Sequence, residues 1–457
     1  METIMVELYR QQAAQWRLEL RLEEEALSLR AGDEAKTVLA GLGKRESVTV
    51  ELVRRAAAKA VKTVCSLGGE SAVLDAAPAV ELLGEAGLSA LVQGAELCRY
   101  QQESWKAVPE KPFTLYLAGT EGLDGEAALA RARALVRGIC FTRDLVNCPP
   151  NRMTPEHLAQ RAVEAGEKAG LEVQVLDEKE TRELGMAAFH AVGDSSANPP
   201  RLIVLRYRGG RQGEAPLALV GKGVTFDSGG YCIKTTAGMR DMKTDMAGAA
   251  SVCGAILALA ENKVPVNVVA VIPAVENRIS PDSFLPGDVI GSMAGKSIEI
   301  GSTDAEGRLI LADAVTYAIE KEHAGRVVDI ATLTGAIARM LGGVAAGVMA
   351  NDDAFFAKLQ AAAERAGERF WRMPDYPEYN KLIESPVADL RNTSNGVAGA
   401  ITAGLFIAAF AGDTPWLHLD IAGTAWSNSS EKEYQTAGAT GMGVVTLYEL
   451  CRAMADK

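Results

Sequence analysis

Apolar residues in the last two thirds of the chain form short runs that alternate with longer apolar or amphipathic segments. Apolar runs of about 4–8 residues between turn residues indicate buried strands, and segments above about ten residues indicate helices. The predicted strands lie at 202–207, 217–220, 266–272, 327–331 and 417–421. The predicted helices lie at 246–260, 309–322, 355–365 and 398–410. This α/β alternation predicts a mostly parallel central sheet flanked by helices, with ligands bound beyond the carboxyl ends of the strands.

The N-terminal part of the chain has a different, mixed α/β pattern. Residues 18–35 are densely charged and are predicted to be helical. An Ala/Lys-rich helix is predicted at 54–64 and a strand at 113–118. We find no clustered chemistry here.

A long predicted helix at 127–146 joins the two parts and ends where prolines prevent its continuation. We therefore expect a small N-terminal α/β domain at 1–122, a linker helix at 123–146 and a larger C-terminal domain at 147–457.

Composition and charge limit the cellular location and the classes of binding partner that the sequence favours. The 457 residues are 48% hydrophobic and 23% charged, which is typical of globular proteins. No apolar run reaches the roughly 18 residues that a membrane helix needs, and the start of the chain lacks the pattern of a secretion signal. Seven scattered cysteines without a CxxC pair indicate free thiols in a reducing cytoplasm. The net charge of −12 makes binding to nucleic acid or to anionic membranes unlikely as the main role.

The segment 302–309 carries the most informative chemistry. Asp304, Glu306 and Arg308 occupy alternate positions between an apolar run at 297–300 and a predicted helix. In an extended segment, side chains two apart point the same way, so these three charges would converge. Arg308 at a helix start opposes the helix dipole, which indicates a bound anion nearby.

A second cluster follows the predicted strand at 217–220. Lys222 and Asp227 lie in a glycine-rich stretch that we expect to be a loop, because glycines let a backbone turn and approach a ligand closely. Asp245 lies at the predicted start of the next helix. With Asp304 and Glu306, these residues form an oxygen-rich set that suits hard or borderline divalent ions. Four carboxylates in a dry pocket need counter-charge, which two divalent cations about 3.5–4 Å apart supply.

Each of these residues also has an ordinary explanation when it is taken alone. Asp245 alone is more often a helix N-cap, Asp227 a turn residue, and Lys222 a solvated or phosphate-contacting side chain. The methionines at 239, 242 and 246 have helix-like spacing that usually means core packing. No P-loop, HExxH or GxSxG motif is present. A two-metal phosphoesterase would use similar carboxylates, and that alternative stays open on the residues alone.

Taken together, the segments resemble the cytosol (leucyl) aminopeptidase family over about residues 125–457. The matching text is GKGVTFDSGG at 221–230 followed by Lys234, MKTDMAGAA at 242–250, TDAEGRL at 303–309, TLTGA at 332–336 and HLDIAG at 418–423. The order and the spacing are those of the family.

The resemblance implies a metal-dependent aminopeptidase with two divalent ions, Zn²⁺ or Mn²⁺. Lys222, Asp227, Asp245 and Glu306 would hold the tighter ion. Asp227, Asp304 and Glu306 would hold the exchangeable one, so Asp227 and Glu306 would bridge. Lys222 must be neutral to donate to a metal, and nearby cations would lower its pKa.

The resemblance also implies a mechanism. A metal-activated hydroxide would attack the first peptide bond of a peptide with a free N-terminus. Lys234 would stabilise the oxyanion, and Arg308 would hold a bicarbonate as general base. Met242 and the segment of Thr332, Leu333 and Gly335 would line an apolar pocket for leucine or a similar first residue.

Two further expectations come from the comparison with the family pattern. Ser302 stands where the family usually has Asn, beside the metal-binding residues, and is a candidate for altered substrate binding. Family members are homohexamers, so we expect a homohexamer. A DNA-binding role, known in some bacterial relatives, is disfavoured by the net charge.

Overall fold

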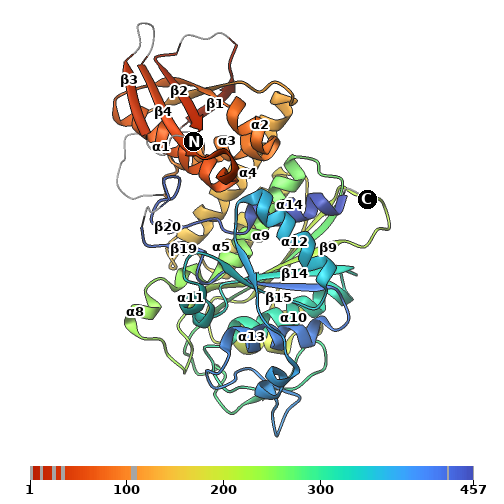
Figure 1. The fold of residues 1–457 in the computed structure, drawn as a ribbon. Coiled ribbons are helices and arrows are strands. Elements are labelled where there is room, and N and C mark those ends of the chain that lie inside the picture. Colours follow the sequence, from red (N-terminus) through yellow and green to blue (C-terminus); the bar gives the residue numbers. More distant parts are fainter. Residues whose placement is uncertain are drawn as a thin grey trace.

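The computed structural model describes residues 4–10, 14–22, 27–31, 36–103, 111–429 and 432–455. It confirms the expected fold class, with a small N-terminal α/β region and a larger C-terminal region built on a mostly parallel sheet. Figure 1 shows the two regions one above the other, joined by helix α4 (Gly125–Asn147).

The N-terminal region contains a six-stranded sheet in the order β1-β6-β5-β2-β4-β3. All neighbouring strands are parallel except β3 and β4. The strands are β1 (Ile4–Leu8), β2 (Trp16–Leu22), β3 (Leu27–Ala31), β4 (Lys36–Gly43), β5 (Ser71–Asp75) and β6 (Phe113–Ala118). Its helices are α1 (Val50–Ser66), α2 (Ala77–Leu83) and α3 (Glu85–Leu97), with a short 3-10 turn η1 (Arg45–Ser47).

The predicted helix at 18–35 is wrong. The described parts of this stretch are strands β2 and β3, while 23–26 and 32–35 lie outside the described residues. Trp16, Leu18 and Leu20 are buried and alternate with charged residues, which is the period-2 pattern of a half-buried strand. The high charge density obscured this pattern. The predicted helix at 54–64 and the strand at 113–118 are found as α1 and β6.

Helix α4 is packed along its length, and so it is more than a connecting segment. It begins at the N-cap Asp124, whose side chain accepts from Ala127 N at 3.2 Å. It contacts α3 of the smaller region and α9 (Ala247–Glu261) of the larger one. A Cβ on Gly138 would lie 2.5 Å from the carbonyl oxygen of Gly254, so a glycine is needed where these two helices cross. The expected domain boundaries at 122 and 146 stay a prediction.

The larger sheet has the order β16-β15-β18-β14-β9-β11-β8-β7, with β10 paired to β11. Strands β18, β14, β9, β11 and β10 are parallel to one another, and β15, β8 and β7 pair antiparallel at the flanks. The strands are β7 (Glu172–Leu176), β8 (Arg201–Arg208), β9 (Leu217–Gly221), β10 (Gly223–Asp227), β11 (Asn267–Asn277), β14 (Arg326–Ala331), β15 (Ala346–Ala350), β16 (Phe370–Arg372) and β18 (Trp416–Asp420). Strands were correctly predicted at β8, β9, β11, β14 and β18.

Helices cover both faces of this sheet. The helices are α5 (Pro155–Lys168), α6 (Glu178–Glu183), α7 (Ala187–Gly193), α8 (Thr236–Met239), α9, α10 (Glu306–Glu320), α11 (Gly335–Leu341), α12 (Asp353–Ala366), α13 (Gly399–Ala411) and α14 (Val444–Ala455). Short elements complete the region: η2 (Met242–Met246), η3 (Pro377–Ile383), β12 (Val289–Ile290), β13 (Ile298–Glu299), β17 (Leu390–Arg391), β19 (Trp426–Ser427) and β20 (Gly438–Ala439). The four helices predicted from the sequence are α9, α10, α12 and α13.

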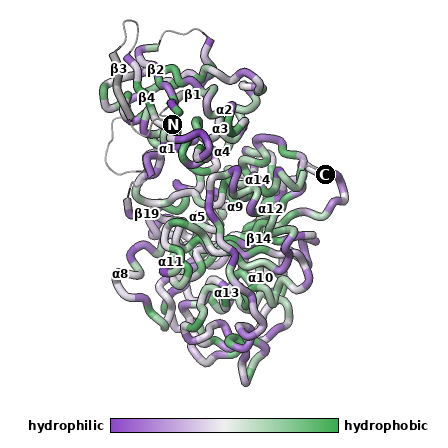
Figure 2. The backbone as a smooth tube through the Cα atoms, viewed as in Figure 1, coloured by the Kyte–Doolittle hydropathy of each residue, from purple (hydrophilic) through white to green (hydrophobic). Residues whose placement is uncertain are grey.

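The two faces of the sheet belong to separate hydrophobic cores. Along β9, Leu217 and Leu219 enter a core with α4, α9 and α14, while Ala218 and Val220 enter a core with α10 and α13. Successive strand residues point to opposite faces, so one strand supplies both cores. Figure 2 shows hydrophobic residues concentrated on these inner elements. The carboxyl ends of the parallel strands are thereby held at one rigid edge.

One helical stretch, Met242–Glu261, is long and apolar enough to cross a membrane by length and composition alone, although it includes the charged residues Lys243, Asp245 and Glu261. Most of it is buried inside the protein, and its helix α9 lies between the sheet and α4. A buried core helix meets the same criterion, because it also lacks a polar face.

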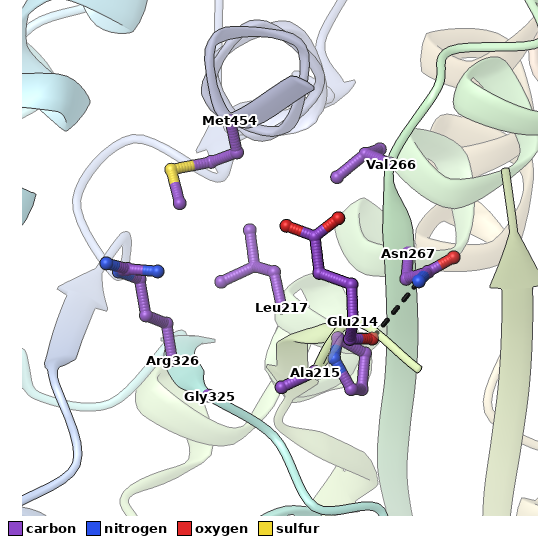
Figure 3. A pocket seen from close by; sticks show the side chains of 9 residues that line it. Glu214, Ala215, Leu217, Val266, Asn267, Gly325, Arg326 and Met454 are labelled. Carbon is purple, nitrogen blue, oxygen red and sulfur yellow. Dashed lines mark hydrogen bonds between the residues drawn. The ribbon is translucent and has the colours of Figure 1, made fainter. Parts of the chain in front are cut away.

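A small pocket of about 140 Å³ lies at the amino ends of the parallel strands of the larger sheet, opposite the edge formed by their carboxyl ends (Figure 3). Leu217, Asn267 and Arg326, which line it, are the first residues of β9, β11 and β14. Ligands of parallel α/β sheets bind at the carboxyl ends of strands. The candidate chemistry therefore lies at the far end from this pocket.

Asp313 on α10 holds two neighbouring segments in place and provides a test of the fold. Its carboxylate oxygens accept from Phe189 N at 2.9 Å and from Met293 N at 2.8 Å. Burial raises the pKa of Asp313 to about 7, above its ordinary 3.8, although these N–H groups oppose the rise. Between those values the folded state binds a proton that the unfolded chain releases. The free energy of unfolding should therefore fall as the pH rises from about 4 to about 7.

We expect Asp313→Asn to remove this part of the pH dependence, because the amide does not titrate. It should also lower the free energy of unfolding at pH 5 by about 1–3 kcal/mol, since the amide nitrogen cannot accept from a backbone N–H. Urea unfolding at several pH values measures both effects, with the exposed Asp413→Asn as the matched control. An unchanged pH slope in Asp313→Asn would show that another group is responsible.

Candidate functional site

The candidate residues come from four segments that meet at the carboxyl edge of the larger sheet. Lys222 directly follows β9, Asp227 ends β10, Asp245 lies in η2, and Asp304 and Glu306 lie at the start of α10. The carboxyl ends of parallel strands share one edge, so segments far apart in the sequence converge there.

Three local expectations need correction. The glycine-rich stretch contains strand β10, because Gly223–Asp227 pairs with β11, and so Lys222 and Asp227 do not share one loop. Asp245 lies inside the 3-10 helix η2 and does not cap α9. Glu306 and Arg308 lie in the first turn of α10, so helix geometry rather than an extended segment sets their directions.

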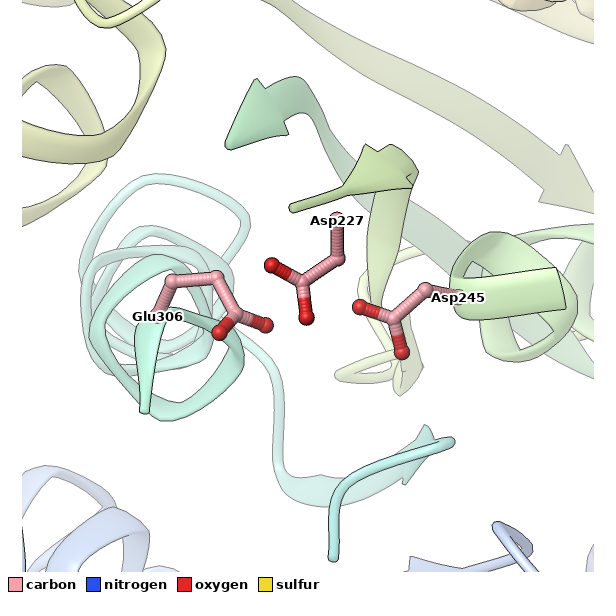
Figure 4. Close-up of side chains that lie close together, drawn as sticks. All are labelled: Asp227, Asp245 and Glu306. Carbon is pink, nitrogen blue, oxygen red and sulfur yellow. The ribbon is translucent and has the colours of Figure 1, made fainter. Parts of the chain in front are cut away.

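Three buried carboxylates form a compact acidic cluster. Oxygens of Asp227, Asp245 and Glu306 all lie within 4.8 Å of one another (Figure 4). Each of the three residues is at most 5% exposed. Asp304 lies outside this group, and its side chain is 38% exposed. The structure thus brings three of the four predicted carboxylates together and places the fourth at the rim.

Two lysines neutralise part of this charge. Lys222 Nζ lies 2.8 Å from Asp245, 2.9 Å from Glu306 and 2.9 Å from the carbonyl oxygen of Thr332. Lys234 Nζ lies 2.7 Å from Asp227 and 2.5 Å from Asp304, so it joins the cluster to the rim. A Cβ on Gly307 would lie 2.5 Å from Lys222 Cε, and only glycine at this position leaves room for the lysine.

The pKa shifts show that the cluster lacks positive charge. Burial and the neighbouring Glu306 raise the pKa of Asp227 to about 6, although Lys234 opposes the rise. Burial also raises the pKa of Asp245 and of Asp304. Only Glu306 is shifted down, because Lys222 and Lys234 outweigh the effect of burial. Three of the four carboxylates therefore resist ionisation where they lie.

This shortage of positive charge is what divalent cations correct. Glu306 Oε2 is buried and has no hydrogen-bond partner among the described residues. Oxygen donors of this kind and spacing suit borderline or hard divalent ions. Without such ions, burial disfavours charged Lys222, but Asp245 and Glu306 outweigh it and raise its pKa. A metal ion beside Lys222 would act in the opposite direction.

Hydrogen bonds that the sequence did not reveal orient the acidic cluster. Asn277, the last residue of β11, donates to Asp227 Oδ1 at 2.8 Å and to the carbonyl oxygen of Thr303 at 3.0 Å. Thr332 Oγ1 donates to Asp245 Oδ1 at 3.0 Å. The one sequence signal for Asn277 is a polar pair, Glu276-Asn277, that ends an otherwise apolar strand.

Arg308 is buried near the cluster, and its Nε has no hydrogen-bond partner among the described residues. Burial lowers the pKa of Arg308 to about 10, although Glu306 and Asp420 oppose the fall. A buried guanidinium with an unused donor is suited to a small anion, as the sequence predicted.

Ser302 is held at the rim by Asn392, which accepts from Ser302 N at 3.2 Å and donates to its carbonyl oxygen at 2.7 Å. Ser302 Oγ in turn accepts from Asp304 N at 3.2 Å. Ser302 thus contacts the backbone of the rim residue Asp304 through its hydroxyl group.

The segment expected to contact substrate lies beside the cluster. Thr332, Leu333 and Gly335 follow β14, and Gly335 begins α11. Asp420, at the end of β18, accepts from Leu333 N at 3.1 Å and from Thr334 Oγ1 at 2.7 Å. Met242 begins η2 and is half-buried. Asp420 therefore fixes this segment, and no local sequence signal pointed to that contact.

Comparisons with known proteins point to one family over almost the whole chain. Two models of the cytosol aminopeptidase family match: the family's N-terminal domain at residues 23–109 and the family's catalytic domain at residues 140–448. A probable cytosol aminopeptidase of Clostridium perfringens is 48% identical over 423 residues, covering 90% of this chain and 85% of the relative. One from Roseiflexus castenholzii is 43% identical, covering 91% and 87%.

A solved structure has the same fold. It is described as the bottromycin maturation enzyme BotP in complex with Mn, and it matches with a TM-score of 0.89 at 33% identity. The match covers 97% of this chain and 100% of that one. The N-terminal part, which carried no family text that we could identify, is therefore similar to known proteins as well.

We expect Glu306→Gln to weaken divalent metal binding by about tenfold or more while the fold is kept, because the amide preserves shape and removes charge. Metal content after dialysis and calorimetric titration with Mn²⁺ measure the loss, and circular dichroism checks the fold. Asp241→Asn is the matched control, since Asp241 lies close to the cluster residue Asp245 in sequence but does not belong to the cluster. Equal metal content in Glu306→Gln and the parent protein would contradict a metal site at the acidic cluster.

Proposed function

Because this chain belongs to the cytosol aminopeptidase family and is thus a metal-dependent aminopeptidase acting on peptides, we propose that it removes leucine and similar apolar residues from free N-termini. The single observation that carries this proposal is the buried acidic cluster of Asp227, Asp245 and Glu306, with Lys234 at its edge. Family membership also favours peptides over the phosphoesters that a two-metal site could otherwise serve.

The residues fit two divalent ions. Lys222, Asp227, Asp245, Asp304 and Glu306 would hold them. Such ions supply a water made acidic enough, with a pKa near 7, to act as a hydroxide nucleophile at neutral pH. Mn²⁺ and Zn²⁺ are the metals to test, and the similar BotP structure is a complex with Mn.

Lys234 is positioned to stabilise charge on the substrate. Its side chain is 18% exposed, and its Nζ lies between Asp227 and Asp304 at the open side of the cluster. Burial disfavours its charged form, but Asp227 and Glu306 outweigh this effect and raise its pKa, so it stays protonated near pH 7. A fixed ammonium in a partly dry site favours the developing oxyanion.

Arg308 is placed to hold the general base as a bound anion. Its burial and its Nε, which has no partner among the described residues, suit a bicarbonate, which would supply a general base when bound. The arginine itself stays charged and holds the anion in place.

Specificity for the N-terminal residue comes from two features. The α-amine of the substrate must be unblocked to reach the acidic cluster. Leu333 and Met242 would line an apolar pocket for its side chain, and Asp420 keeps the segment at 332–335 in place. An apolar pocket gives graded preference, at about 1–3 kcal/mol per methylene.

We also propose a cytoplasmic homohexamer. Several large apolar side chains on the surface are 58–65% exposed, which favours association: Met340, Val344, Trp371, Tyr376, Val387 and Val397.

With Mn²⁺ or Zn²⁺ added, the protein should hydrolyse Leu-p-nitroanilide but not N-acetyl-Leu-p-nitroanilide, because acetylation removes the free amine. Release of p-nitroaniline measures both rates. Gly-p-nitroanilide should be hydrolysed more slowly than the leucine compound if the pocket is apolar. Equal turnover of the free and acetylated substrates would overturn the proposal.

Lys234→Gln should lower kcat by about 10²–10³-fold with a smaller change in KM, because the lost charge acts mainly on the transition state. Metal content should stay near that of the parent protein, which separates this effect from metal loss. Lys321→Gln, at an exposed position, is the matched control. A large rise in KM with kcat unchanged would instead assign Lys234 to substrate binding.

A further inference from the structure

A cavity of about 390 Å³ lies where the N-terminal region meets the larger one. Helices α1, α3 and α4 line one side of it. The other side consists of the end of α12 and the residues after it, residues within 423–427 and 432–442, and α14. None of the proposed metal, catalytic or substrate residues lines it. Its volume falls within the range of about 300–1,000 Å³ that is usual for small-molecule sites.

One arginine in this cavity has unused donors. Arg143, on α4, is 1% exposed, and its Nε donates to the carbonyl oxygen of Thr440 at 3.1 Å. Its Nη1 and Nη2 have no hydrogen-bond partner among the described residues. The guanidinium carbon lies 5.2 Å from the centre of the Tyr100 ring, which covers one face of the group. Burial lowers the pKa of Arg143, but an arginine stays protonated near pH 7.

Neighbouring charged side chains have partners, and Arg143 differs from them. Arg54 donates to Glu51 at 2.8 Å, to Gln93 at 3.1 Å and to the carbonyl oxygen of Ala366 at 2.7 Å. Each of its three guanidinium nitrogens thus has a partner.

Two further charged residues of the lining also have partners, and Arg369 is exposed. Arg55 pairs with Glu433 at 2.6 Å. The oxygens of Glu368 accept from Gly443 N and from Thr446 Oγ1. No carboxylate among the described residues lies within ion-pair distance of Arg143, and the lining is predominantly cationic.

We propose that this cavity binds a small molecule through an oxyanion group, a carboxylate or a phosphate-like group, held by Nη1 and Nη2 of Arg143. A guanidinium presents parallel N–H donors in a fork that matches two oxygens of such a group. A buried charge without a counter-ion is unfavourable, so the anion would stabilise the folded protein. This inference does not depend on the proposed peptidase function.

Occupation of the site would tie the two regions together. Arg143 lies on α4, which packs against α3 of the N-terminal region and α9 of the larger one. Thr440, its one hydrogen-bonded partner among the described residues, belongs to the larger region. A ligand that binds only the folded protein raises the midpoint of thermal unfolding in a saturable way.

The test uses the metal-loaded, full-length protein, with sulfate and acetate as separate probes. Both are titrated to 20 mM at constant ionic strength, with chloride as the balancing anion. For binding near 1 mM, the expected rise in Tm is about 2 °C for a chain of this size. A response to sulfate alone assigns a phosphate-like group, and a response to acetate alone assigns a carboxylate.

Arg143→Met should abolish the saturable rise in Tm. Arg137→Met, on the same helix but paired with Glu261 at the surface, should keep it. Arg308→Met should also keep it, which separates this cavity from anion binding at the proposed active site. If Arg143→Met does not fold, Arg143→Lys decides the question, because it keeps the charge but loses the fork and should weaken binding by tenfold or more. No rise with either anion, or an unchanged rise in the Arg143 variants, would overturn the proposal.

Discussion

The architecture of the site depends on the close approach of three buried carboxylates at the carboxyl edge of the larger sheet. Oxygens of Asp227, Asp245 and Glu306 lie within 4.8 Å of one another in a buried space. Lys222 and Lys234 offset part of that charge, and the remainder raises the pKa of Asp227 and Asp245. Like charges in a dry site repel strongly, so further cations stabilise the arrangement. Divalent metal ions fit that need in both charge and ligand type.

The fold meets this constraint by holding each carboxylate on a different rigid element. Asp227 ends a strand, Asp245 lies in η2 and Glu306 begins a helix, and the sheet behind them has a packed core on each face. Hydrogen bonds from Asn277 and Thr332 then fix the carboxylate orientations. These supports come from separate parts of the chain, so the geometry does not rest on a single loop. Side chains held in this way suit catalysis, where placement decides the rate.

Two buried arginines show the same physical principle at different places. Arg308 near the acidic cluster and Arg143 at the junction of the two regions both keep guanidinium donors without a partner among the described residues. By contrast, each guanidinium nitrogen of Arg54, beside Arg143, has a protein partner. Unused donors on a buried cation suit a bound anion, and the two proposals for anion binding rest on this contrast.

The sequence by itself determined the alternation of strands and helices in the larger region and the residue types of the site. Buried parallel strands need continuous apolar runs, and metal sites need carboxylates, so both leave local patterns. The tertiary structure alone decided the rest. It made strands of 16–22 and 27–31, where charge density hid a period of two. It formed β10 by pairing with β11, and it brought Asn277 and Asp420 to the site. It also left Arg143 without a full set of partners. These features depend on contacts between residues distant in sequence, which no local pattern records.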